Sequence, residues 1–154
     1  MTGKIAQRLA ERGIALPRAA TPAANYVPAV AGGGLLFISG QLPVLDGERR
    51  HQGKLGAGIT IEEGYAAARL CGLNIVAQIL AHAGDLDRVA RIVKLTGFVN
   101  STPDFEDQPK VVNGASDLMA EIFGEAGRHA RSAVGVAALP FGVAVEVEAI
   151  VEIA

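Results

Sequence analysis

The sequence contains few side chains that can do chemistry, and their spacing excludes several classes of site. His51, His82 and His129 lie far apart, and none stands in an H-x-x-x-H or C-x-x-C arrangement that would place two ligands on one metal ion. Cys71 is the single cysteine, and its apolar neighbours in a helical pattern are typical of a small buried hydrophobe. A G-x-S-x-G nucleophile elbow and a dinucleotide-binding glycine loop are both missing. We therefore expect no metal, no organic cofactor and no serine-hydrolase triad.

Arg131 is the candidate that remains. It stands at the start of an apolar strand pattern, where its guanidinium cannot lose its charge and must be paired or solvated. Such an arginine is either the partner of a carboxylate within the fold or a fork for the carboxylate of a ligand. The spacing of the residues favours neither interpretation over the other.

The elements that must position Arg131 are predicted from the periodicity of the apolar residues. Apolar residues spaced by three and four positions, with glycine stops, indicate helices at 2–12, 62–84 and 109–124. Runs of β-forming residues indicate strands at 26–31, 35–39, 89–100, 131–138 and 143–153. The polar, glycine-rich segment 46–58 is predicted to be a surface loop.

This order of strands and helices predicts an α+β fold with two main helices packed on one sheet face. The strand at 35–39 nevertheless has apolar residues on both faces, with Leu35 and Phe37 on one and Leu36 and Ile38 on the other. Because two helices can cover only one face, we expect a partner subunit to cover the second.

Length and composition bound the class of protein. A chain of 154 residues with 50% hydrophobic residues is long and apolar enough for one domain with a substantial core. Its formal net charge of −2 and scattered basic residues provide no electrostatic footprint for nucleic acid. Charges interrupt the apolar stretch at the N-terminus, which excludes a signal h-region there. We therefore expect a cytoplasmic protein that binds neither nucleic acid nor membrane.

Three motifs closely resemble the YjgF/RidA family. They are LFISGQLP at 36–43, RSAVGVAALP at 131–140 and VEVEAI at 145–150, and the resemblance extends from about residue 25 to 153. It implies a chorismate-mutase-like α+β fold with a mixed sheet, a homotrimer, and ligand clefts between subunits. It also implies hydrolysis of reactive 2-imino or 2-amino-enoic acids to 2-oxo acids and ammonia, without a cofactor.

The resemblance implies catalytic roles for two residues. Arg131 is similar to the family's arginine that grips the substrate carboxylate. Glu146 is similar to the carboxylate associated with the attacking water. Glu146 shares a strand face with Glu148, so a solvated charge at the rim of the sheet is the alternative interpretation.

Further residues are implied to line the cleft and bind substrate. Tyr26 resembles the tyrosine that closes the cleft, and Asn113 resembles the family's helical asparagine. Ser39 and Gly40 match a cleft-lining strand end, and Ala133 stands where many members have cysteine. Each has a structural alternative: packing for Tyr26, a strand end for Ser39 and Gly40, and a solvated helix position for Asn113.

The sequence also departs from compact members of the family. Residues 1–24 are predicted to add a helix and an extended segment to a single domain spanning 1–154, and the loop at 46–58 is longer. Two functions therefore remain open: imine/enamine deamination, or binding of a small carboxylate metabolite without turnover. RNA cleavage is disfavoured because the chain has no basic stripe.

Overall fold

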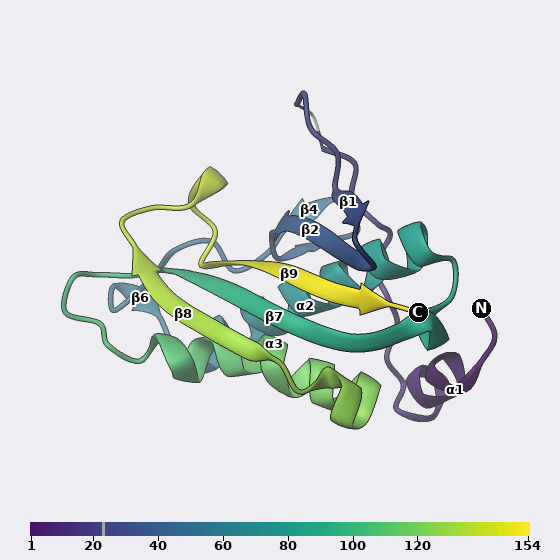
Figure 1. Cartoon of the computed structure of the whole chain (residues 1–154). Coiled ribbons are helices and arrows are strands. Elements are labelled where there is room, and N and C mark those ends of the chain that lie inside the picture. Colours follow the sequence, from purple (N-terminus) through teal and green to yellow (C-terminus); the bar gives the residue numbers. More distant parts are fainter. Residues whose placement is uncertain (23) are drawn as a thin grey trace.

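The structure is a computed structural model that describes residues 1–22 and 24–154. Within these residues, five strands form one mixed sheet in the order β1-β2-β9-β7-β8. Their bounds are Ala29–Gly32 (β1), Leu35–Gln41 (β2), Val89–Asn100 (β7), Ala130–Val136 (β8) and Val145–Ile153 (β9). Strands β7 and β8 pair in parallel and the other neighbours pair antiparallel, as Figure 1 shows.

Two long helices, α2 (Ile61–Ala83) and α3 (Gln108–Phe123), pack on the same face of the sheet (Figure 1). Thr60 begins α2 by accepting a hydrogen bond from the Glu63 N–H, and Gly84 ends it in the left-handed conformation. Helix α2 is long and apolar enough to cross a membrane by composition alone. Most of it is buried between the sheet and α3, so its apolar character is explained by the core. The expected α+β fold with two helices on one face is confirmed.

The short N-terminal helix α1 (Lys4–Glu11) packs at the end of the sheet, near both termini (Figure 1). The Asp87 carboxylate, in the short 3-10 helix Leu86–Arg88, accepts hydrogen bonds of 2.8 Å from the backbone N–H groups of Lys4 and Ile5. Leu9 is buried in the main core. The N-terminal helix predicted at 2–12 is therefore part of the domain's packed structure.

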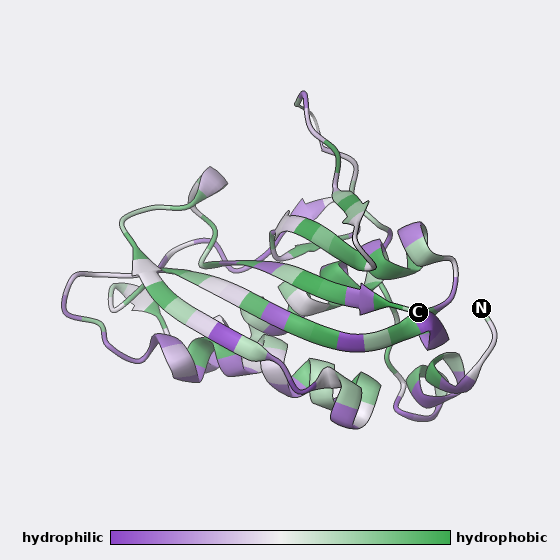
Figure 2. Ribbon diagram, in the orientation of Figure 1, coloured by the Kyte–Doolittle hydropathy of each residue, from purple (hydrophilic) through white to green (hydrophobic). Residues whose placement is uncertain are grey.

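The second face of the sheet has no helix over it among the described residues. Strand register places Val30 beside Phe37, and Phe37 beside Ile150, on this open face. Val30 and Phe37 are 56% and 45% exposed. Figure 2 shows that hydrophilic residues interrupt the hydrophobic ones along these strands. Val30 and Phe37 are the exposed apolar side chains of the open face that a partner subunit would cover.

The segment 46–58 differs from the predicted surface loop. It contains β4 (Glu48–Arg49), which pairs with β3 (Val44–Leu45), and β5 (Lys54–Leu55), which pairs with β6 (Gly58–Ile59). Leu55 is fully buried in the core, and the Lys54 ammonium donates a 2.6 Å hydrogen bond to Asn100 Oδ1. The surface-loop prediction was wrong at β5, because long-range contacts with β7 bury a segment whose local composition is polar.

The predicted hairpin forms with a shorter first strand. Gly33 and Gly34, both with positive φ, make the two-residue turn between β1 and β2. The strand begins at Ala29 rather than at residue 26, because Pro28 has no N–H to continue the ladder. The segment that contains Tyr26 is left free of the sheet.

Candidate functional site

The guanidinium of Arg131 is held by helix α3. Arg131 lies near the start of β8, where the register with Leu95 of β7 turns its side chain to the helix-covered face. Nη1 donates to Asn113 Oδ1 at 2.8 Å and to Ser116 Oγ at 3.2 Å, and Nη2 donates to the Pro109 carbonyl at 3.4 Å. The sequence-predicted pair Arg131 and Asn113 is thus brought together.

The hydrogen bonds of Arg131 leave two of its five N–H groups unused. Among the residues that the structure describes, no carboxylate lies within 4.0 Å of it. Three of its five N–H groups are engaged, and the Nε–H and the second Nη2–H have no acceptor in the described chain. Nε and Nη2 share one edge of the planar guanidinium, and this is an edge that can bind a carboxylate at two points. Of the two interpretations left open by the sequence, the described residues provide no carboxylate partner for Arg131, and the ligand fork stays a prediction.

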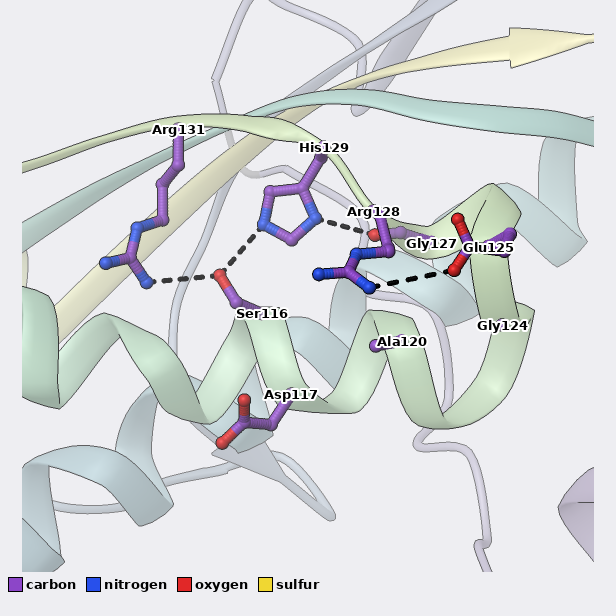
Figure 3. A pocket seen from close by; sticks show the side chains of 9 residues that line it. All are labelled: Ser116, Asp117, Ala120, Gly124, Glu125, Gly127, Arg128, His129 and Arg131. Carbon is purple, nitrogen blue, oxygen red and sulfur yellow. Dashed lines mark hydrogen bonds and ion pairs between the residues drawn. The ribbon is translucent and has the colours of Figure 1, made fainter.

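Ser116 and His129 extend this arrangement (Figure 3). Ser116 Oγ lies 2.8 Å from His129 Nε2, and His129 Nδ1 lies 2.7 Å from the Gly127 carbonyl oxygen. Burial, and then the positive charge of Arg131, lower the pKa of His129, so its imidazole is neutral at pH 7. Arg131, Ser116 and His129 line an open pocket of about 650 Å³.

Glu146 lies in β9 on the open face of the sheet. Burial, and then the neighbouring charge of Glu148, raise the pKa of the Glu146 carboxyl. Gly40 of β2 makes room for this carboxylate, because a Cβ atom at position 40 would collide with Glu146 Oε2. The two sequence-predicted residues Gly40 and Glu146 therefore meet, and any larger residue at position 40 would displace the Glu146 carboxylate.

Tyr26, Ser39 and Gly40 line a second pocket of about 210 Å³. Ser39 Oγ donates to the Pro28 carbonyl at 3.1 Å, which ties β2 to the segment before β1. Phe141 also lines this pocket and is held by the Arg49 guanidinium, 3.6 Å from the centre of its ring. This grouping of Tyr26, Ser39 and Gly40 is the second half of the predicted site.

One chain does not bring the two halves together. Arg131 pairs with Leu95 on the helix-covered face, whereas Glu146 pairs with Phe98 on the open face. A guanidinium and a carboxylate on opposite faces of one sheet cannot contact the same small substrate. The joint catalytic role of Arg131 and Glu146 stays a prediction that requires a second protomer.

Sequence reasoning missed Ser116 and considered His129 only as a metal ligand. The available signal was spacing: Asn113 and Ser116 are three residues apart on one helix face, and His129 is two residues before Arg131, which is the spacing of side chains on one side of an extended segment. Cys71 behaves as expected for a buried hydrophobe, because its thiol is enclosed in the core and burial raises its pKa.

Comparison with known proteins identifies the family of this chain. The sequence profile described as "YjgF/chorismate mutase-like, putative endoribonuclease" matches residues 6–153. The chain belongs to the YjgF/RidA family. Membership and the chorismate-mutase-like fold are therefore confirmed, and the match begins inside helix α1.

Relatives within the YjgF/RidA family align with nearly the whole chain. Protein TCP17 of Trypanosoma cruzi is 57% identical over 153 residues, covering 99% of this chain and 96% of TCP17. The crystal structure of Atu1372 from Agrobacterium tumefaciens, a protein of unknown function, is 49% identical with a TM-score of 0.91, covering 97% and 92% of the two chains. E. coli TdcF, solved with bound serine, is 29% identical with a TM-score of 0.66, covering 89% and 94%.

The structure places Ala133, the position at which the sequence resemblance leads us to expect a cysteine in other members, beside Arg131. Ala133 lies two residues after Arg131 on the same strand and packs against the core. A methyl group there provides no thiol, so chemistry at this half of the site rests on Arg131 and the groups bonded to it.

Proposed function

We propose that this protein hydrolyses reactive 2-imino or 2-amino-enoic acids to 2-oxo acids and ammonia. The observation that carries the proposal is that Arg131 is a fixed cation with two unused N–H groups and no carboxylate partner in the described chain. It matches a small ligand with a carboxylate, as a 2-imino acid has. TdcF, a structural relative, was solved with an amino acid bound.

Glu146 is the group that activates water in this proposal. A carboxylate whose pKa is raised by burial is a stronger base than an exposed one, and it takes a proton from water as the oxygen attacks C2 of the imine. The resulting carbinolamine loses ammonia, which carries away the transferred proton, and the 2-oxo acid remains. The water oxygen becomes the new carbonyl oxygen, so no cofactor is consumed.

A cyclic homotrimer would complete the site. The open sheet face, with Val30 and Phe37 exposed, is the surface that we propose to be buried between protomers. In a head-to-tail ring, the Arg131 side of one protomer meets the Glu146 side of the next. Each interface then holds one substrate between two chains, in a cytoplasmic protein.

The test is the release of ammonia and 2-oxo acid from a panel of imino acids generated fresh by an amino-acid oxidase. We expect wild-type protein to accelerate release and Glu146→Gln to lose that acceleration while still binding the 2-oxo acid product. Binding of carboxylates by wild-type protein without any acceleration would replace the deaminase with a binding protein. Equal release by both proteins would refute the role of Glu146.

RNA cleavage is not proposed, although the family description includes that activity. Affinity for nucleic acid comes mainly from cationic contacts to phosphates. The chain has 14 basic and 16 acidic residues, and the pocket that contains Arg131 is also lined by Asp117 and Glu125.

A further inference from the structure

We propose that His129 is a positioning residue that acts through Ser116 to hold the guanidinium of Arg131 ready for a carboxylate. The inference rests on the proposed function only in taking a carboxylate as the ligand. The four groups involved, from Arg131 to the Gly127 carbonyl, appear together in Figure 3.

Arg131, Ser116, His129 and the Gly127 carbonyl are linked by three successive hydrogen bonds, which we call the relay. The contacts fix the direction of each of these hydrogen bonds. The Gly127 carbonyl can only accept, so His129 Nδ1 carries the proton of the neutral ring and donates it over 2.7 Å. His129 Nε2 is then an acceptor, and the Ser116 hydroxyl donates to it over 2.8 Å. The lone pairs of Ser116 Oγ are left to accept from Arg131 Nη1 at 3.2 Å. All three bonds run from Arg131 towards Gly127.

The fold holds each member of this relay in place. Ser116 is in the middle of α3, Gly127 is in the 3-10 helix Gly124–Gly127, His129 immediately precedes β8, and Arg131 is the second residue of β8. Gly127 is buried and packs closely against α3, because a Cβ atom there would collide with the backbone of Met119. Hydrogen bonds aligned in one direction polarise one another, so the last acceptor strengthens the first bond.

The relay determines which edge of Arg131 is presented. With Nη1 held by Asn113 and Ser116 together, the guanidinium cannot rotate, and its Nε–H takes no part in the contacts with α3. Without an acceptor at position 129, the Ser116 hydroxyl can turn its proton elsewhere and the second contact to Nη1 weakens. If the guanidinium is free to rotate, binding a carboxylate must also immobilise it, and this entropy cost lowers the affinity for the carboxylate.

The neutral state of His129 keeps the relay in this direction. Burial and the charge of Arg131 disfavour the imidazolium, and the pKa of His129 is lowered accordingly. The charged groups that line the same pocket are Asp117 on α3, Glu125 and Arg128 near Gly127, and Arg131 on β8. Arg128 is 3.6 Å from Glu125, and Asp117 accepts from the Tyr65 hydroxyl, so neither carboxylate is bonded to the ring.

The experiment measures pyruvate binding to the full-length protein by calorimetry at pH 7.5. Ser116→Ala and His129→Phe are each expected to raise the dissociation constant for pyruvate about tenfold, equivalent to about 1.4 kcal/mol. The double variant should bind no worse than either single one, because both changes break the same relay. His129→Gln should recover affinity to within about threefold, since its amide oxygen can accept from Ser116. His82→Phe is the matched control, because His82 also bonds a backbone carbonyl but lies at the end of α2.

Additive losses in the double variant, or wild-type affinity in His129→Phe, would overturn the relay. A failure of the deaminase proposal looks different: pyruvate binds with the predicted pattern but imino acids are not hydrolysed. If wild-type protein binds no pyruvate, the relay is judged from the NMR signals of the Arg131 side chain. Broadening of the Arg131 Nε–H signal in His129→Phe and its recovery in His129→Gln support the relay, and unchanged spectra in all variants refute it.

Discussion

Replacing Arg131 by lysine separates a carboxylate fork from a structural ion pair. An ammonium keeps the charge but cannot donate two parallel hydrogen bonds to one carboxylate. Loss of one charge-assisted hydrogen bond costs about 1.5–3 kcal/mol, so the affinity for a 2-oxo acid should fall roughly 10- to 150-fold. Arg131→Ala removes both hydrogen bonds and the charge, so its affinity for a 2-oxo acid should be lower still.

The structure predicts only a small effect of the same changes on stability. Arg131 is half-buried and has no carboxylate partner among the described residues, so its removal strands no charge. It loses contacts with Asn113, Ser116 and the Pro109 carbonyl, two of which are long. We expect a cost of about 1 kcal/mol, or roughly 2–4 °C in the melting temperature. Removing half of a buried ion pair would instead cost about 3–5 kcal/mol.

Melting temperature, oligomeric mass, affinity for pyruvate and turnover of imino acids should be measured on the same preparations. Arg128→Lys is the matched control, because Arg128 lines the same pocket, is 72% exposed and pairs with Glu125. This control should bind and turn over within about twofold of wild type, as surface pairs contribute little. Wild-type affinity and turnover in a well-folded Arg131→Ala protein would refute the site.

Four further predictions follow from the fold and the site. Light scattering at micromolar concentration should give about three times 15.9 kDa for wild type and a smaller mass for Phe37→Asp; a monomeric wild type would contradict a site shared between protomers. Glu146→Gln should melt higher than wild type at pH 7 but not at pH 4: a pKa raised by folding means that stability is lost as pH rises through it. A lower melting temperature at pH 7 would contradict this. Gly40→Ala should reduce turnover by displacing the Glu146 carboxylate while the trimer persists, and unchanged turnover would show that the contact is irrelevant. Prolonged chelation should leave activity unchanged, whereas loss that is restored by a divalent ion would reveal a metal requirement.

The sequence by itself determined the elements, because their signals are local. Strand β7 has the predicted bounds of Val89 and Asn100, and the helix expected at 62–84 occupies 61–83. Glycine stops, Pro109 in the first turn of α3 and apolar periodicity act over a few residues, so they can be recognised without knowing the fold. The motifs around Ser39, Arg131 and Glu146 likewise identified the family, which the comparisons confirmed.

Only the tertiary structure shows which face of the sheet each residue lies on. Strict alternation places Ile92 and Leu95 on opposite faces of β7, yet both are fully buried, because the register with β9 shifts between Ile92 and Lys94. Such a bulge depends on the neighbouring strand, whose identity is set by the sheet order and not by local sequence.

The composition of the site was also decided by the fold. Asn113, Ser116, His129 and Arg131 meet only because β8 pairs in parallel with β7 and lies along α3. The same sheet order places Glu146 on the opposite face from Arg131, although the two residues are only fifteen positions apart in sequence. Local patterns report which residues a chain has and how each segment folds, whereas hydrogen-bond partners and sheet faces are set by contacts between segments distant in sequence.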